Sequence, residues 1–255
     1  HSRHRASGHE PFLPKLQGTL GQAMPVYLCL MRYMLFGFGF GITVAQAQTW
    51  SRLPDFPGTA RDDASAFTIG NTVFVGTGRE VSFGLTNDWY AFDMLGQSWT
   101  PIATLPASGR QYCSAFSDVT YGYLFGGVDA DGPLNELWRY DPLLDEWAEM
   151  SPLPAAGRFA TVAFNNGMVC TGLLNGDIAT NECWQYNPNG DTWTLRASVP
   201  GPARHRASGS GAIPQVIGGA DAAGNALSDS YRYDPTTAVW APISILPAPR
   251  LGADA

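Results

Sequence analysis

Histidine and lysine are scarce in this sequence of 255 residues. Of four histidines only His205 lies beyond residue 9, and the single lysine is Lys15. One histidine provides no zinc triad, and without a later lysine Schiff-base chemistry is excluded from most of the chain. There is also no Cys-x-x-Cys pair, nucleophile elbow, Walker loop or dinucleotide fingerprint. We therefore predict no catalytic residues, no metal site and no cofactor.

Positive charge is scarce beyond residue 47. The charged residues before that point are Arg3, Arg5, Glu10, Lys15 and Arg32. The remainder has 11 basic and 21 acidic residues, a formal net charge of −10. Phosphate binding needs a basic face, so we expect no nucleic-acid partner.

The first 47 residues differ in composition from the rest. Residues 1–30 are mostly patternless and are predicted to be an upstream or disordered leader. Residues 31–47 resemble a signal peptide: a short positive start, an apolar stretch over 34–44, and Ala45-Gln46-Ala47 as a cleavage pattern. This predicts an extracellular, periplasmic or cell-envelope protein. An uncleaved anchor over 26–44 and a plain disordered leader are the alternatives, and only the anchor implies a membrane partner.

The rest of the chain repeats. A tryptophan recurs every 46 to 49 residues, and an arginine follows it ten or eleven residues later. The tryptophans are Trp50, Trp99, Trp147, Trp193 and Trp240, and the arginines are Arg61, Arg110, Arg158, Arg204 and Arg250. Each unit continues with an apolar run ending in glycine, a polar loop and an aromatic strand. Four short strands per unit, with Gly and Pro too frequent for helices of useful length, predict an all-β chain of β-propeller blades.

The second repeat identifies a family resemblance. It carries Gly126-Gly127 after its second strand, Tyr140-Asp141 on its third and Trp147 on its fourth. These residues resemble the repeat of the kelch family, and the likeness extends from about residue 50 to the C-terminus. Repeats one and three have Gly76-Thr77-Gly78 and Thr171-Gly172-Leu173 instead, so we expect those two turns to differ in detail.

Complete repeats span 61–99, 110–147, 158–193 and 204–240, which predicts four complete four-stranded blades. Trp50 precedes the first arginine and Arg250 opens another inner strand, so partial blades are expected at both ends of a truncated propeller over 48–255. Kelch-like rings usually close by pairing an N-terminal strand with the last blade. We accordingly expect six blades in the full-length protein, rather than five or seven.

Three cysteines fall within the repeats. Cys170 and Cys183 lie on neighbouring predicted strands of one repeat, whereas Cys113 lies in another. An oxidising compartment would allow a disulfide between Cys170 and Cys183, but we favour buried free thiols. Asp129-Ala130-Asp131-Gly132 hints at a calcium loop, yet Tyr140 stands where the closing Glu would be, so we interpret it as a turn.

The repeated arginines are the candidate ligand-binding residues. Each precedes an innermost strand, so propeller symmetry places Arg61, Arg110, Arg158, Arg204 and Arg250 near one mouth of the central channel, with His205 beside them and Arg206 close by. Guanidinium groups gathered there would suit an anionic ligand. The other interpretation, which we favour, is a structural clamp in which each arginine binds carbonyl groups of the adjacent blade. Phe83 is the one aromatic residue in the loops between second and third strands.

Three functions follow from these observations. The lack of a catalytic set favours a non-enzymatic propeller that binds a protein or glycan. The family resemblance implies a sugar-active alternative similar to the sialic acid mutarotases, with Arg61, Arg110, Arg158 or His205 near an acidic sugar. It also implies a copper-radical oxidase similar to galactose oxidase, whose histidines would lie in missing blades.

Overall fold

A computed structural model describes residues 51–210 and 213–252. The predicted leader, the signal peptide and Trp50 lie outside the described residues. All regular structure in the described residues is β-strand. Across this part of the chain, no helix has the length and hydropathy needed to cross a bilayer.

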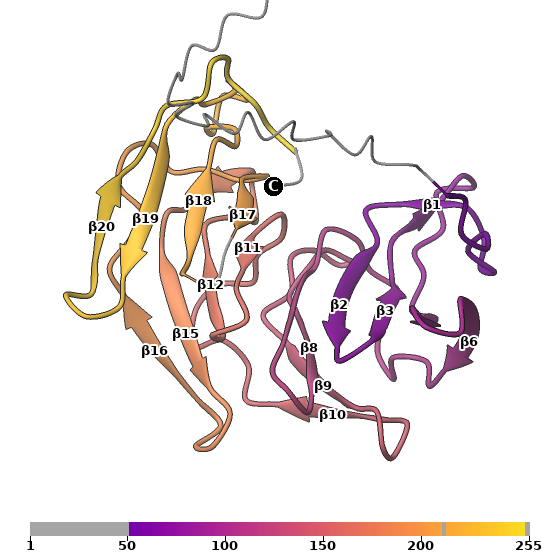
Figure 1. Ribbon diagram of the computed structural model, residues 1–255. Coiled ribbons are helices and arrows are strands. Elements are labelled where there is room, and N and C mark those ends of the chain that lie inside the picture. The colour runs from indigo at the N-terminus through magenta and orange to yellow at the C-terminus, as the bar shows by residue number, and fades with distance from the viewer. Residues whose placement is uncertain (1–50, 211–212, 253–255) are drawn as a thin grey trace, which may run out of the picture. The chain divides into compact units, whose positions relative to one another are not determined.

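Four antiparallel sheets of four strands follow one another along the chain and form the blades of a β-propeller (Figure 1). Blade one contains β2 (Ser65–Ile69), β3 (Thr72–Gly76), β5 (Trp89–Asp93) and β6 (Ser98–Ile102). Blade two contains β7 (Ser114–Ser117), β8 (Gly122–Phe125), β9 (Leu137–Asp141) and β10 (Glu146–Met150). Blade three contains β11 (Val162–Ala163), β12 (Met168–Cys170), β15 (Cys183–Asn187) and β16 (Thr192–Arg196). Blade four contains β17 (Ser208–Ser210), β18 (Gln215–Ile217), β19 (Ser230–Asp234) and β20 (Val239–Pro242). The prediction of four complete blades is confirmed.

The first strand of each blade is the innermost. Contacts between β2 and β7, between β7 and β11, and between β11 and β17 place these strands side by side at the centre. Two short ladders involve the loops between second and third strands. In blade three β13 (Leu173–Leu174) and β14 (Ile178–Ala179) form a hairpin within this loop. In blade one β4 (Arg79–Glu80) of this loop pairs with β1 (Arg61–Asp62), which precedes the first strand of the blade. One end of the propeller therefore carries these loops and the repeat arginines, and the other carries the tight turns.

The repeat tryptophans join neighbouring blades. Trp147 on β10 packs its ring 5.0 Å from that of Trp89 in blade one, and its indole N–H donates to the Ala103 carbonyl between the blades. Trp193 and Trp240 make the same type of bond, to the carbonyls of Ser151 and Ala197. The large rings thus fill the wedge between blades while their one polar atom stays hydrogen-bonded.

The glycine turns are more uniform than expected. In blade two Gly126 and Gly127 have φ of 61° and 90°, and in blade three Thr171 and Gly172 have φ of 66° and 115°. The prediction that the threonine-containing turns differ was wrong, because Thr171 and its counterpart Thr77 adopt the left-handed conformation of the glycine they replace. That conformation is costly for a β-branched residue. Propeller packing imposes it here against local preference.

Cys170 and Cys183 form a disulfide between β12 and β15. The preference for free thiols was therefore wrong for this pair. The two residues face each other directly in the ladder, and both are fully buried. Cys113 is a free thiol, and burial raises its pKa to about 12, so it remains protonated at neutral pH and is a poor nucleophile.

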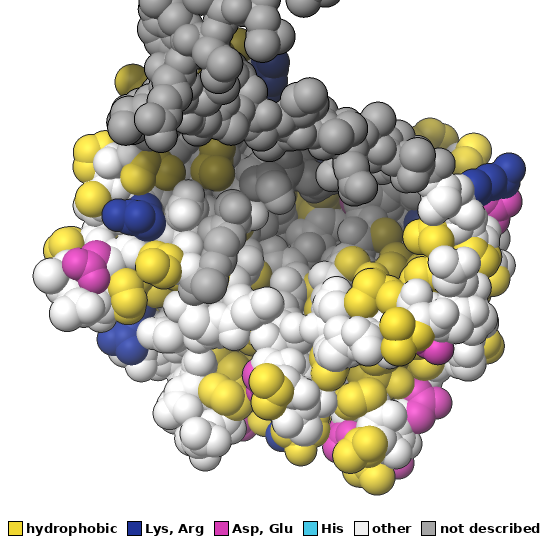
Figure 2. Space-filling model, viewed as in Figure 1, with side chains coloured by type: hydrophobic (Ala, Val, Ile, Leu, Met, Phe, Trp, Pro, Cys, Tyr) yellow, Lys and Arg dark blue, Asp and Glu magenta, His cyan; other side chains and the backbone are white. Residues whose placement is uncertain are grey.

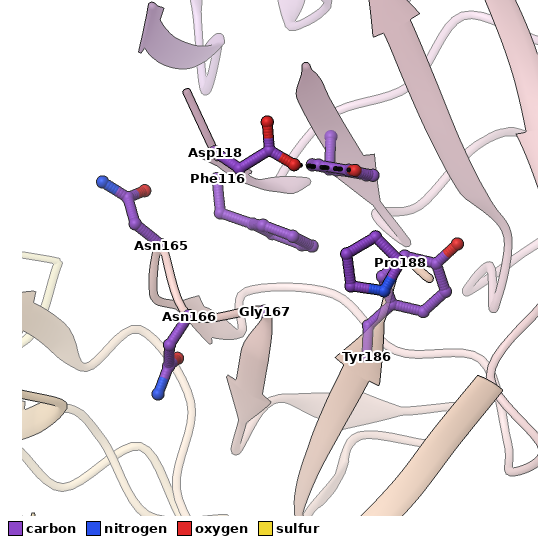
Figure 3. A pocket seen from close by; sticks show the side chains of 8 residues that line it. Phe116, Asp118, Asn165, Asn166, Gly167, Tyr186 and Pro188 are labelled. Carbon is purple, nitrogen blue, oxygen red and sulfur yellow. Dashed lines mark hydrogen bonds between the residues drawn. The ribbon is translucent and has the colours of Figure 1, made fainter. Parts of the chain in front are cut away.

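A small cavity of about 100 Å³ lies between blades two and three, at the end with the tight turns (Figure 3). Phe116 stacks on Tyr123 with ring centroids 4.9 Å apart, and Tyr123 donates to the Asp118 carboxylate. Asp118 also accepts the backbone N–H groups of Thr120 and Tyr121. Its carboxylate is thus engaged in shaping the turn.

Apolar side chains reach the surface mainly over blades one and two in the view of Figure 2. The largely exposed apolar side chains of loops and turns include Val81, Phe83, Leu143 and Leu144. Asp129, in the loop where a calcium site was considered, accepts the N–H groups of Asp131 and Gly132 through one oxygen. This is a turn, as predicted.

Candidate functional site at the channel mouth

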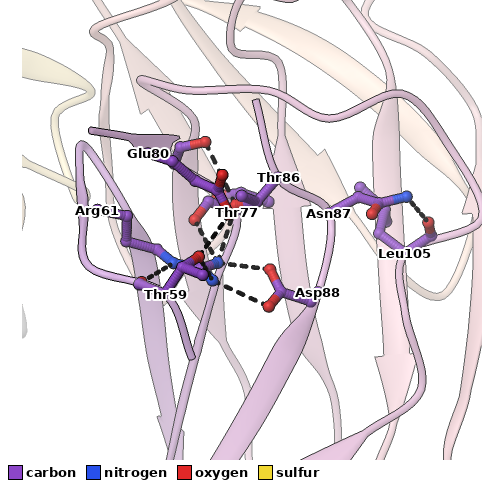
Figure 4. Close-up of polar contacts among 9 residues, drawn as sticks. Thr59, Arg61, Thr77, Glu80, Thr86, Asn87, Asp88 and Leu105 are labelled. Atoms are coloured by element: carbon purple, nitrogen blue, oxygen red, sulfur yellow. Dashed lines mark hydrogen bonds and ion pairs between the residues drawn. The ribbon is translucent and has the colours of Figure 1, made fainter. Parts of the chain in front are cut away.

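Each of the first four repeat arginines forms an ion pair within its own blade. Arg61 donates from Nη1 to Thr86 Oγ1 at 2.8 Å and from Nη2 to Asp88 Oδ2 at 2.9 Å, and it also reaches the Thr77 carbonyl (Figure 4). The pairs in the other blades are Arg110–Glu136, Arg158–Glu182 and Arg204–Asp229, with N···O distances of 2.8, 3.0 and 2.7 Å. The four arginine side chains are at most 3% exposed.

The backbone of the later repeat arginines, from Arg110 onwards, binds the preceding blade. Arg158 donates its N–H to Leu134 O at 2.9 Å, and its carbonyl accepts the N–H of Gly127 at 3.1 Å. The same two bonds are formed by Arg110, Arg204 and Arg250 at their own blade junctions. Arg110, Arg158 and Arg204 therefore each join two blades, through the backbone to one and the side chain to the other.

This geometry favours the structural clamp over direct ligand binding at Arg61, Arg110, Arg158 and Arg204. The clamp differs from the expected one, since the side-chain partner is a carboxylate of the same blade. Arg250 is exposed and has no carboxylate partner among the described residues; its side chain donates to the Pro249 carbonyl. Its backbone nevertheless pairs with Leu227 and Gly219.

His205 follows Arg204 directly in the sequence and is half-buried. Its backbone pairs with Ala220, and its Nδ1 is buried without a hydrogen-bond partner. Burial, and then the charge of Arg206, lower the pKa of the imidazole below its ordinary 6.5. His205 is therefore neutral at pH 7.

The channel mouth is formed two residues after each repeat arginine. The residues at these positions are Asp63, Tyr112, Ala160, Arg206 and Gly252, with φ of 53°, 55°, 52°, 51° and 60°. Backbone hydrogen bonds of 2.9 Å link them in turn, from Ala160 to Tyr112, from Arg206 to Ala160 and from Gly252 to Arg206. A left-handed residue in every repeat, four of them not glycine, is a strained arrangement that only the surrounding structure can hold.

Three of these side chains form a polar cluster. Arg206 donates from Nη2 to the Tyr112 hydroxyl at 2.7 Å, and its guanidinium lies 4.8 Å from the Tyr112 ring centroid. Tyr112 also hydrogen-bonds Asp63. Burial raises the pKa of Asp63 above 3.8 even though the Tyr112 bond lowers it, and burial together with Asp63 raises the pKa of Tyr112 above 10. At pH 7 the cluster holds a carboxylate, a neutral phenol and a guanidinium.

The cluster borders a cavity of about 470 Å³, which is large enough for a small ligand or the side chains of a protein loop. The remaining lining residues are Ala64, Cys113, Ala160, Thr161, Ala207 and Gly252. The side chains that line the cavity between the polar groups are therefore small, so its wall lies close to the backbone. His205 and the repeat arginines are not among the lining residues.

The polar cluster lies two positions after the repeat arginines, which the sequence analysis named as candidate ligand-binding residues. Arg206 was noticed there only as an addition to the arginine ring, and Asp63 and Tyr112 were not proposed as site residues. The sequence did contain a signal for the arginine ion pairs, because an acidic residue follows each of the first four arginines by 24 to 27 positions. Arginine side chains paired in this way do not line the channel cavity, and residues two positions later line it instead.

Metal ligands do not gather anywhere in the described part of the chain. Within residues 51–210 and 213–252 no three His, Cys, Asp or Glu side chains are grouped as a metal ion would need. The cluster of Asp63, Tyr112 and Arg206 can instead bind a ligand through hydrogen bonds and charge.

Comparisons with known proteins agree on the architecture. The family model described as the KLHDC2/KLHL20/DRC7 Kelch-repeats domain matches residues 42–212. Among solved structures, one titled "Structure of YjhT" matches with a TM-score of 0.66 and 20% identity, over 77% of this chain and 69% of that one. No curated protein matches. At such an identity the structural likeness concerns the fold alone.

Proposed function

This chain belongs to the kelch-repeat family, and from that premise we propose that it is a non-enzymatic binding module that holds a protein or glycan ligand at the channel mouth. The carrying observation is the Arg206–Tyr112–Asp63 cluster on the rim of the 470 Å³ cavity. Rigid blades present the cluster, and left-handed backbone at all three residues maintains its geometry.

The cluster suits a ligand with an anionic or hydroxyl-rich group. Arg206 uses one of its five donors on Tyr112, so further N–H groups are available to oxygen atoms of a ligand. Asp63 can accept hydroxyl or amide donors from the same ligand. A glycan with a carboxylate, or a polypeptide with an acidic side chain, matches both features.

We place the protein in the extracellular space, periplasm or cell envelope. The disulfide between Cys170 and Cys183 supports this, because structural disulfides persist in oxidising compartments. The acidic, lysine-free repeat region does not suit a nucleic-acid partner.

The test is a binding titration with three proteins: wild type, Arg206→Met and the control Arg232→Met, which removes an exposed arginine of β19. Glucuronic acid, N-acetylneuraminic acid and an acidic peptide are the probes, followed by saturation-transfer NMR. Binding to at least one probe should weaken tenfold or more in Arg206→Met and stay unchanged in the control. Equal behaviour of both variants would refute the site.

A sugar-active function is the second candidate, and the same cluster favours it. Asp63 with its raised pKa lies beside Tyr112, which gives a proton acceptor and donor next to Arg206, a group able to hold a sugar carboxylate. The anomer exchange rate of the acidic sugar, followed by NMR, separates the two functions. A binder leaves the rate unchanged; an enzyme accelerates it and loses that effect in Tyr112→Phe. Because Arg110 is buried, its substitution is not informative here.

A copper-radical oxidase is less well supported. Its histidine ligands would have to come from sequence beyond the described repeats, since His205 alone follows residue 9. Copper analysis of the purified protein, together with an assay for peroxide production from alcohols, tests this alternative directly.

A further inference from the structure

The loop between the second and third strands of blade one projects two apolar side chains into solvent. Val81 is 82% exposed and Phe83 is 76% exposed, in the hairpin that begins with β4 and is closed by the bridge between Arg79 and Leu85. The corresponding loops of blades two and four expose only small or polar residues at their tips, and that of blade three exposes Ile178. Blade one therefore differs from the other blades in exposing an aromatic side chain in this loop.

The backbone holds Phe83 in this position at a cost. Its φ of 67° is left-handed, which is rare for an aromatic residue. Two hydrogen bonds of 2.8 Å close the turn, from the Phe83 N–H to Glu80 O and from the Glu80 N–H to Gly84 O. The Glu80 carboxylate in turn accepts the hydroxyls of Thr59 and Ser82. An organised loop that keeps an aromatic ring in water indicates a contact surface.

A groove lies directly beside this aromatic ring. Its volume is about 370 Å³, and its lining residues are Ala60, Arg61, Asp62, Arg79, Glu80, Val81 and Phe83. Arg79 lies 5.3 Å from the Phe83 ring centroid and forms an ion pair with Asp62 at 3.2 Å. The guanidinium thus supports the ring from one side. The ring and groove together can receive an apolar anchor from a partner, as the centres of protein interfaces do.

The net charge of the repeats selects the class of partner. The charges lining the groove balance, with Arg61 and Arg79 against Asp62 and Glu80, whereas the chain beyond residue 47 carries a formal net charge of −10 and has no lysine. An anionic membrane surface would be repelled. A basic polypeptide would be attracted by the net negative charge of the repeats.

We propose that the Val81–Phe83 loop docks a basic polypeptide segment that inserts one apolar side chain into the groove beside Phe83. This rests on the proposed binding function but uses a surface distinct from the channel mouth. None of the residues lining the channel cavity lines the groove. The two surfaces can therefore be tested independently.

The experiment compares the full chain with two double variants. Val81→Ser/Phe83→Ser removes the loop contact, and Leu143→Ser/Leu144→Ser removes an equally exposed apolar pair from a turn at the opposite end. Fluorescence anisotropy measures binding of labelled peptides with one Leu or Phe flanked by Arg and Lys, of matched peptides flanked by Glu, and of vesicles containing phosphatidylserine.

The basic peptides should bind wild type, bind the loop variant at least tenfold more weakly, bind the control variant normally, and weaken as salt rises. Equal loss in both variants, preference for acidic peptides, binding to vesicles alone, or no binding would each overturn the proposal. Binding of acidic sugars through Arg206 should persist in the loop variant, which keeps failure here separate from failure of the channel-mouth function.

Discussion

Arg204 and Asp229 form a two-pronged ion pair in blade four, from Nη1 to Oδ1 at 2.8 Å and from Nη2 to Oδ2 at 2.7 Å. The arginine is fully buried, and a third bond from Nη1 reaches Gly218 O. The carboxylate is held by Tyr231 as well. In blades two and three a longer Glu takes the place of Asp, and a Trp two residues later replaces the Tyr as donor, as in Trp138 to Glu136.

Substitution of Arg204 by Met should destabilise the protein by about 3 kcal/mol, because it removes one partner of a buried charge pair and leaves several acceptors unpaired. Arg250→Met is the matched control: it removes an arginine at the same repeat position that is exposed and lacks a carboxylate partner in the described structure. Urea unfolding measures both. A shift of similar size in the two variants would contradict the clamp.

Acid should destabilise the clamps. The Arg61 hydrogen bond holds the pKa of Asp88 below its ordinary 3.8. Burial raises the pKa values of Glu182 and Asp229, but their hydrogen bonds outweigh it and both lie below their ordinary values of 4.5 and 3.8. Folded carboxyls then bind protons more weakly than unfolded ones, so their stabilisation is complete above about pH 5 and is lost as pH falls below about 4.

Urea midpoints at pH 7, 5, 4 and 3 test this dependence. The midpoint should hold between pH 7 and 5 and fall below pH 4. The urea midpoint of Arg204→Met should fall less than that of wild type over the acidic range, because Asp229 then lacks the partner that lowers its pKa. A variant that falls as steeply as wild type would show that other groups govern acid unfolding.

Replacement of Thr171 by Gly should stabilise the protein by about 1 kcal/mol. It removes a β-branched residue from φ of 66° and deletes a buried hydroxyl that has no hydrogen-bond partner. The greater flexibility of glycine in the unfolded chain offsets part of the gain. Thermal unfolding should show a higher midpoint.

Gly172→Ala is the opposing control for that turn. Its φ is 115°, and an added Cβ would lie 2.6 Å from Thr161 Cγ2 and 2.9 Å from Phe159 O. It should therefore lower the midpoint. A lower midpoint in Thr171→Gly would show that packing of the threonine methyl outweighs the strain.

The disulfide should contribute about 3 kcal/mol, since it closes a short loop with a sequence separation of 13. Cys170→Ala/Cys183→Ala removes it, and Cys113→Ala removes the free thiol as a control. In urea unfolding without reductant, the double variant should have a clearly lower midpoint than Cys113→Ala. If wild type and the double variant unfold alike, the two cysteines are not joined in the protein as made.

The repeat arginines illustrate the limit of sequence reasoning here. Their period identified the blades, and symmetry predicted that they share one end of the propeller. Symmetry could not show that Arg110, Arg158 and Arg204 turn inward to carboxylates. The acidic partners lie on another strand of each blade, and only the paired strands bring the two charges together.

The sequence by itself determined the all-β class, the four complete blades and the kelch family, because period, glycines and aromatic rings act locally and repeat in every blade. Tertiary structure decided which side chains face the channel. The left-handed backbone at Asp63, Tyr112 and Arg206 is maintained by bonds and packing between blades, and no local preference of these residues would produce it. The same packing brought Cys170 opposite Cys183 and held Thr171 in a glycine's conformation.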